Sequence, residues 1–212
     1  YLESIMRTLS GIPSVEKMTP EMIDALAPMD TTAIANGYLD AVSYLLGDKP
    51  LFIEKLPYNF LYIGFIVKAF PNAKIVRLKR NPMDSCFAIY KQPFTWAYKF
   101  SYNLDDLARY YLAHDKLFSY WRNLLGDQLI EVEYETLVND SENQTRTLLD
   151  RLGLEFEDAC LNFEQNETAT TTASSVQVRE KIHSRSVLRW KRYEEQLKPL
   201  RIRLEAAGIS VE

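Results

Sequence analysis

A short apolar run that leads straight into a helix start is the feature that most constrains the fold of this chain. Residues 73–78 are mainly apolar, and the cations Lys79 and Arg80 follow them directly. Asn81 is a favoured N-cap residue, and Pro82 is favoured in the first turn of a helix. The sequence therefore predicts a buried strand that ends at a helix N-terminus, which is the repeating unit of α/β folds.

The rest of the sequence alternates between short apolar runs and segments with helical periodicity. Thr19 and Asn103 are placed as N-caps, and Gly153 as a C-terminal stop. Further strands are expected at residues 51–53 and 129–132. Helices are expected over residues 1–9, from residue 20, and over residues 31–46, 59–70, 82–91, 103–121, 134–152 and 184–208, the last interrupted around Pro199. This order predicts an α/β fold, with a mainly parallel sheet flanked by helices, in one domain over residues 1–212.

Overall charge and hydropathy exclude several classes of protein. The 212 residues are 47% hydrophobic and carry a net charge of −4, so we expect a globular core and neither a nucleic-acid coat nor a membrane-surface role. No apolar run is long enough to cross a bilayer, and the first residues lack the pattern of a signal peptide. Cys86 and Cys160 have the spacing of neither a zinc site nor a disulfide framework. These features predict a soluble, cytoplasmic protein.

Three clusters hold residue types that suit phosphate or sulfate chemistry. Arg80, beside the exposed N–H groups of a helix start, is placed to bind a phosphate. Lys55 lies between an expected strand and a helix, where an ammonium could neutralise charge on a phosphate or sulfate oxygen. Residues 170–193 combine hydroxyls with several cations, a composition that can surround a polyanion. Each cluster has a plainer alternative, namely a solvated basic pair, a surface lysine and a polar surface loop.

Four blocks of sequence, taken together and in order, resemble one known family. They are residues 54–60, with the sequence Glu-Lys-Leu-Pro-Tyr-Asn-Phe, and residues 70–84, 131–138 and 173–190. The arrangement resembles the sulfotransferases that use 3′-phosphoadenosine 5′-phosphosulfate as donor. It is most similar to the bacterial branch that is often fused to tetratricopeptide repeats and that resembles tyrosylprotein sulfotransferases.

This resemblance implies a P-loop-containing nucleoside triphosphate hydrolase-like fold in which the donor lies across the ends of the parallel strands. Lys55 matches the lysine that stabilises the bridging oxygen as sulfate leaves, and Ser174 matches a serine that helps to hold the sulfuryl group. Arg80 matches the arginine that grips the 3′-phosphate. Tyr134 matches a residue of the adenine-nucleotide pocket, and Arg189 matches a basic residue near the donor phosphates. The family's chemistry requires no metal.

The chain departs from the family pattern in two ways. The family has a serine eight residues after its phosphate-binding arginine, whereas this chain has Ala88, so a weaker grip on the phosphate is expected unless Ser85 substitutes. The first strand, the glycine-rich loop that wraps the 5′-phosphosulfate and the catalytic base are absent from these residues, and Glu3 does not match the position of the base. We therefore expect an amino-terminally truncated sulfotransferase with little or no activity of its own.

Two other functions stay open at this point. A P-loop nucleotide kinase shares strand-to-helix phosphate sites, but its Gly-x-x-x-x-Gly-Lys-Ser/Thr loop is absent from the sequence. A non-catalytic nucleotide- or protein-binding module could retain the same fold. The acceptor class (small molecule, carbohydrate or peptide) and the oligomeric state are not predicted. His114 is expected to pack within a helix interface.

Overall fold

The computed structural model describes residues 1–13, 19–94, 98–166 and 179–212 of the chain. Contacts between residues divide it into two compact units, Tyr1–Ala73 and Lys74–Glu212, which are described separately below.

The first unit is helical in the residues described. Its core is formed by apolar side chains from successive helices, including Met6, Leu26 and Ile34, all of which are fully buried. The Thr19 hydroxyl accepts a hydrogen bond of 3.3 Å from the Met22 N–H, which confirms the predicted N-cap. The elements of this unit are α1 (Leu2–Ser10), α2 (Pro20–Leu26), α3 (Thr31–Val42), the 3₁₀ helix η1 (Asn59–Leu61) and α4 (Ile63–Ala69).

The strand expected at residues 51–53 is wrong. These residues have no regular secondary structure, and the side chain of Ile53 is 95% exposed. A three-residue apolar run can form a strand only when a neighbouring strand supplies hydrogen bonds, and none pairs with it among the residues that the structure describes.

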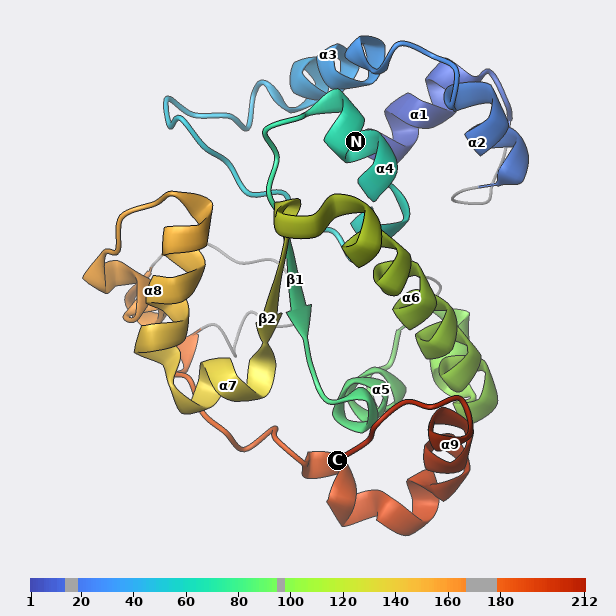
Figure 1. Cartoon of the computed structure of the whole chain (residues 1–212), viewed down its shortest axis with the longest axis vertical. Helices are drawn as coiled ribbons and strands as arrows, with labels where there is room; N and C mark the ends of the chain where they lie inside the picture. Colours follow the sequence, from blue (N-terminus) through green and yellow to red (C-terminus); the bar gives the residue numbers. More distant parts are fainter. Residues whose placement is uncertain (14–18, 95–97, 167–178) are drawn as a thin grey trace. The chain divides into compact units, whose positions relative to one another are not determined.

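The second unit combines helices with a small parallel sheet (Figure 1). Its strands are β1 (Ile75–Lys79) and β2 (Leu129–Glu133). Its α-helices are α5 (Pro82–Tyr90), α6 (Leu104–Leu125), α7 (Tyr134–Asn139), α8 (Ser141–Leu152) and α9 (Glu194–Ala206). Short 3₁₀ helices connect them, namely η2 (Lys99–Tyr102), η3 (Gly126–Gln128), η4 (Asp158–Cys160), η5 (Phe163–Gln165) and η7 (Arg189–Tyr193).

The two strands lie side by side in parallel, with the chain between them passing through α5 and α6 (Figure 1). Their register runs from Ile75 opposite Leu129 to Lys79 opposite Glu133. Helix α6 contacts one face of the sheet, and α8 contacts β2. This arrangement confirms the predicted α/β class with a parallel sheet flanked by helices. The strands predicted at residues 73–78 and 129–132 both lie within two residues of their expected bounds.

A buried arginine joins α6 to the sheet. Arg77 in β1 is only 7% exposed, and its guanidinium forms an ion pair of 2.8 Å with Glu131 of β2. It also lies 3.5 Å from the Asp115 carboxylate and 4.0 Å from the centre of the Phe118 ring, both on α6. Because a buried cation needs compensating charge, this network fixes the helix on one face of the sheet.

The last helix departs from its prediction at a proline. Helix α9 runs unbroken through Pro199, where an interruption was expected, and that expectation is wrong. Proline inside a helix removes one backbone hydrogen bond and costs about 3 kcal/mol. Burial of Leu197, Leu200 and Leu204 on the same helix offsets this cost, since each leucine stabilises the fold by about 2 kcal/mol. In the parts of the chain that the structure describes, no helix is long and apolar enough to span a membrane.

Candidate functional site: a cationic cluster at the carboxyl ends of the strands

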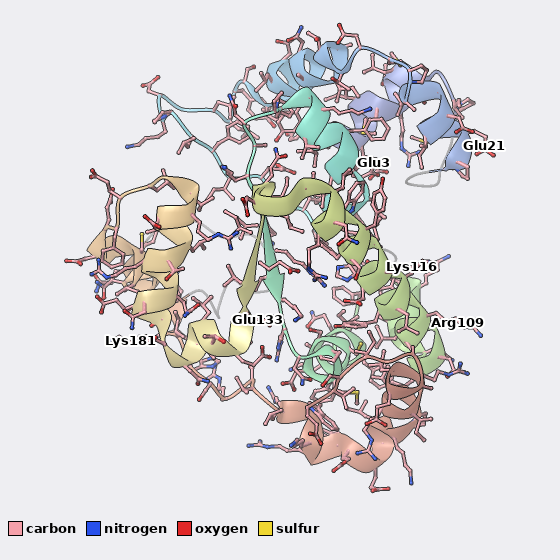
Figure 2. All side chains as sticks on the ribbon, viewed as in Figure 1. Glu3, Glu21, Arg109, Lys116, Glu133 and Lys181 are labelled. Atoms are coloured by element: carbon pink, nitrogen blue, oxygen red, sulfur yellow. The ribbon has the colours of Figure 1, made fainter. Side chains whose placement is uncertain are left out.

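The strand register brings two predicted site residues together. Lys79 and Glu133 end the two strands as register partners and form an ion pair of 2.9 Å; Glu133 is labelled in Figure 2. Arg80 and Tyr134 directly follow the two strands, and the Arg80 guanidinium lies 4.8 Å from the centre of the Tyr134 ring. Parallel strands that end in register therefore place Arg80 and Tyr134 at one edge of the sheet.

Asn81 fixes the start of α5 directly beside Arg80. Its side-chain oxygen accepts hydrogen bonds of 3.0 Å from the Met83 N–H and 3.1 Å from the Asp84 N–H, which confirms the predicted N-cap. The Asn81 backbone N–H in turn donates to the Glu135 carboxylate at 2.9 Å. The start of α5 is thus bound to the first turn of α7, and the positive end of the α5 dipole lies next to the arginine.

The Arg80 side chain is half-buried, and only part of its guanidinium is hydrogen-bonded among the described residues. Its Nη2 donates a hydrogen bond of 2.6 Å to the backbone oxygen of Ser186. Its Nε is buried, and no acceptor lies within hydrogen-bonding reach of it in the described part of the chain. The guanidinium therefore retains donors that neither Ser186 nor Tyr134 engages.

A buried aspartate, which the sequence reasoning missed, attaches the carboxy-terminal segment to α5. The side chain of Asp84 is 1% exposed, and it accepts hydrogen bonds of 2.6 Å from the Leu188 N–H and 2.9 Å from the Trp190 N–H. Leu188 has a φ of 53°, a left-handed conformation that is uncommon for a non-glycine residue. The carboxylate therefore holds a tight turn whose middle residue is Arg189.

Lys91 is a second residue that the sequence reasoning missed. Its ammonium lies 5.7 Å from the centre of the Phe87 ring on the same helix. Partial burial, with the nearby positive charges of Arg189 and Arg80 as further causes, holds the pKa of Lys91 below its ordinary value. Lys91 is the C-cap of α5, seven residues after Asp84, and no local sequence signal distinguishes it from other surface lysines.

The remaining predicted site residues belong to other parts of the chain. Lys55 belongs to the first unit, in an exposed segment without regular secondary structure. Next to it in sequence, the Glu54 carboxylate accepts hydrogen bonds of 3.2 Å from the Tyr38 hydroxyl and from Asn59 Nδ2. Ser174 falls outside the residues that the structure describes.

His114 packs within α6 and its neighbours. Its ring lies 4.7 Å from the Phe118 ring, measured between centres. Burial, with the Arg77 charge as a further cause, lowers the pKa of His114 to about 4. This neutral, packed state agrees with the expected structural role. Over the described ranges, no group of three or more His, Cys, Asp or Glu residues is arranged to hold a metal ion.

The cluster suits a multiply charged anion. Arginine donors and a helix N-terminus converge at the end of a parallel sheet, which is the usual position of phosphate sites in α/β folds. An aromatic ring beside the arginine adds a surface on which a nucleotide base or sugar can pack.

Comparisons with known proteins show the family of this chain. An uncharacterized protein of Aquifex aeolicus (strain VF5) is 33% identical to this chain over 199 residues, which are 92% of this chain and 26% of that protein. The chain thus spans about a quarter of the length of this relative. A sequence model described as the sulfotransferase family matches residues 3–158, a range that includes Lys55, Arg80 and Tyr134. Since this match covers well over half of the sequence, the chain belongs to the sulfotransferase family.

Proposed function

We propose that this chain binds the 3′-phosphoadenosine part of 3′-phosphoadenosine 5′-phosphosulfate. The observation that carries the proposal is the position of Arg80, between the end of β1 and the N-terminus of α5, with its guanidinium against Tyr134. Arg80 binds the 3′-phosphate, Tyr134 packs against the nucleotide, and Arg189 contacts a donor phosphate from the turn held by Asp84. Charge, hydrogen-bond donors and an aromatic surface are what this ligand requires.

In the whole protein, this site serves transfer of a sulfuryl group to a hydroxyl or amine acceptor. The acceptor oxygen or nitrogen forms a bond to sulfur while the bond between sulfur and the bridging phosphate oxygen breaks, and adenosine 3′,5′-bisphosphate leaves. The acceptor proton passes to a general base. Lys55 stabilises the charge that develops on the bridging oxygen, and Ser174 holds the sulfuryl group. A small molecule, a carbohydrate or a peptide side chain can supply the acceptor, and the transfer itself requires no metal.

We also propose that β1 and β2 belong to a larger sheet of the P-loop-like type. On the face of β1 opposite Arg77, the side chains of Val76 and Leu78 are 46% and 57% exposed. Two-stranded sheets are marginally stable alone, and each strand has one backbone edge without a partner strand among the described residues, which favours further strands. The exposed apolar side chains favour a layer that covers this face. These observations on β1 support a larger sheet without reference to the phosphate site.

The 212 residues contain no glycine-rich loop, and we propose that they bind the nucleotide without transferring sulfate on their own. The second candidate, a non-catalytic nucleotide-binding module, is favoured by the same observation. Both candidates require binding at Arg80, so binding is the first property to measure.

Thermal unfolding in the presence of nucleotides tests the proposal. Adenosine 3′,5′-bisphosphate should raise the unfolding temperature, whereas ATP with Mg²⁺ should raise it less. The Arg80→Met variant should lose the difference. Stabilisation by ATP with Mg²⁺ but not by the bisphosphate would favour a kinase-type site, and equal stabilisation of wild type and Arg80→Met would contradict the assigned role of Arg80.

A further inference from the structure

The chain between α3 and η1 contains Lys55, the lysine to which the proposed chemistry assigns the bridging oxygen. Residues 51–56 of this chain segment have no regular secondary structure (Figure 1). Among the described residues, none of residues 51–55 takes part in a hydrogen bond between backbone groups. Side-chain contacts of the neighbouring residues therefore decide how firmly the backbone at Lys55 is held.

Tyr38 of α3 anchors the segment just before Lys55. Its side chain is 5% exposed and packs edge-to-face against Phe70, with 5.7 Å between the ring centres, while the Phe52 ring stacks on it at 6.3 Å. The Tyr38 hydroxyl donates a hydrogen bond of 3.2 Å to Oε2 of Glu54. Burial, with the Glu54 charge as a further cause, raises the pKa of Tyr38 to about 12, so its hydroxyl remains a donor at neutral pH.

Asn59, the first residue of η1, contacts the chain on both sides of Lys55. Its Nδ2 donates a hydrogen bond of 3.2 Å to Oε1 of Glu54. Its backbone N–H donates one of 3.0 Å to the carbonyl oxygen of Leu56. Lys55 thus lies between two residues that are each bonded to Asn59. Since consecutive Cα atoms are about 3.8 Å apart, these contacts restrict the backbone at Lys55 from both ends.

Both oxygens of the Glu54 carboxylate accept hydrogen bonds from neutral donors. Lys55 is exposed, and within the described ranges its ammonium forms no ion pair or hydrogen bond, so its three donors remain for a ligand. We propose that Glu54 is a positioning residue, which Tyr38 and Asn59 hold so that Lys55 is fixed in place and its ammonium stays available to the bridging oxygen of the donor. The proposal rests on the proposed function and adds to it the residues that hold Lys55.

The contact between Lys55 and the donor can be measured without sulfate transfer. When the bond between sulfur and the bridging oxygen breaks, that oxygen becomes an oxygen of the 5′-phosphate in adenosine 3′,5′-bisphosphate. A lysine that stabilises charge on this oxygen should also bind the 5′-phosphate, and adenosine 3′-monophosphate lacks this group. The ratio of the dissociation constants for the two nucleotides therefore reports on Lys55, whereas Arg80 contributes to binding of both.

Titration calorimetry with this pair of nucleotides is the main test. The preference for the bisphosphate should fall roughly tenfold in Lys55→Met, which removes a charge-assisted contact, and roughly threefold in Tyr38→Phe, which removes only the hydroxyl that holds Glu54. The control Tyr44→Phe makes the same change at an exposed tyrosine of the same unit and should leave the preference unchanged. When Lys55→Met is already present, Tyr38→Phe should have no further effect, because a positioning residue acts through the lysine.

Glu54→Gln tests the carboxylate itself. Loss of a negative charge would by itself favour binding of an anion. The replacement also takes away one of the two oxygens that accept from Tyr38 and Asn59, so the preference for the bisphosphate should fall despite the change in charge. An unchanged or increased preference would overturn the positioning role of Glu54.

Trypsin measures the hold on the backbone by an independent route. Lys49 precedes a proline and is not cleaved, so within residues 43–60 trypsin can cut only after Lys55. The rate of this cleavage should rise roughly fivefold in Tyr38→Phe, because the segment opens more often when one hydrogen bond is lost. Tyr44→Phe should leave the rate unchanged. Equal rates in wild type and Tyr38→Phe would contradict the proposed anchor.

The outcomes separate this proposal from the proposed function. If Lys55→Met loses the preference for the bisphosphate while Tyr38→Phe keeps it, the positioning role is wrong and the proposed function stands. If Tyr38→Phe lowers the preference equally with and without Lys55, the contacts are merely structural and the proposal is overturned. If wild type binds the two nucleotides equally, the proposed role of Lys55 is wrong, and positioning by Glu54 fails with it. Thermal unfolding of each variant without nucleotide verifies that the fold is intact.

Discussion

Replacing Asp84 with alanine should destabilise the second unit strongly. Its carboxylate accepts hydrogen bonds of 2.6 and 2.9 Å from the N–H groups of Leu188 and Trp190, and the side chain is 1% exposed. A hydrogen bond to a charged group contributes about 1.5–3 kcal/mol, and a buried donor without an acceptor adds its desolvation cost. The expected loss in free energy of unfolding is therefore about 3–5 kcal/mol.

The chain offers a matched control in Asp106. Asp84 and Asp106 both occupy the third position of a helix that begins after an asparagine N-cap, so both interact favourably with the helix dipole. Asp106, however, is exposed, and among the described residues its carboxylate forms a single ion pair, of 3.7 Å with Arg109. Asp106→Ala should cost at most about 1 kcal/mol, the sum of a dipole interaction and a surface ion pair. The difference between the two variants isolates the contacts that Asp84 makes with the carboxy-terminal turn.

Tryptophan fluorescence during urea unfolding is the assay. The tryptophans are Trp96, Trp121 and Trp190, so the signal reports on the second unit. Equal destabilisation by Asp84→Ala and Asp106→Ala would refute the reasoning, because it would mean that the buried carboxylate contributes no more than an exposed one.

Three further predictions follow from buried groups. His114 has a folded pKa of about 4, below its ordinary value of 6.5, so protonation favours the unfolded chain and stability should fall as pH drops from 6.5 towards 4. The loss between pH 7 and pH 5 should be about 2 kcal/mol, and His114→Gln should reduce the pH dependence measured by urea unfolding; an unchanged dependence would contradict the shift. Burial raises the pKa of the Cys86 thiol to about 12, so a thiol reagent should modify the exposed Cys160 in the native protein and Cys86 only after denaturation, as mass spectrometry can establish. Arg77→Met should cost about 3 kcal/mol of unfolding free energy, since it leaves Asp115 and part of the Glu131 charge uncompensated, and a loss below about 1 kcal/mol would argue against a structural role for the network.

Local signals explain why the unit of β1 and α5 was predictable. Apolar residues before Arg80 and the Asn81-Pro82 pair after it determine a strand end and a helix start within a few residues of sequence. The apolar run at residues 129–132 predicted a strand that ends just before Tyr134, and the parallel register of the two strands places Tyr134 beside Arg80. The proximity of Arg80 and Tyr134, expected from the family resemblance, is therefore explained by strand pairing.

Interactions between distant residues explain why Asp84 and Lys91 were not predicted. Asp84 has the same local sequence role as Asp106, and only its partners more than 100 residues away distinguish it. For Lys91, burial and the charges of Arg189 and Arg80 lower the pKa, and these causes depend on how the distant carboxy-terminal segment packs on α5. For residues 51–53, hydrophobicity alone was a poor guide, since a strand depends on a neighbouring strand that the local sequence does not reveal.

The most direct test of the account is a crystal structure of this chain with adenosine 3′,5′-bisphosphate. The account predicts that oxygens of the 3′-phosphate lie within hydrogen-bonding distance of the Arg80 guanidinium at the N-terminus of α5, with the nucleoside against Tyr134. A nucleotide bound with its 3′-phosphate away from Arg80, at saturating concentration, would contradict the central claim.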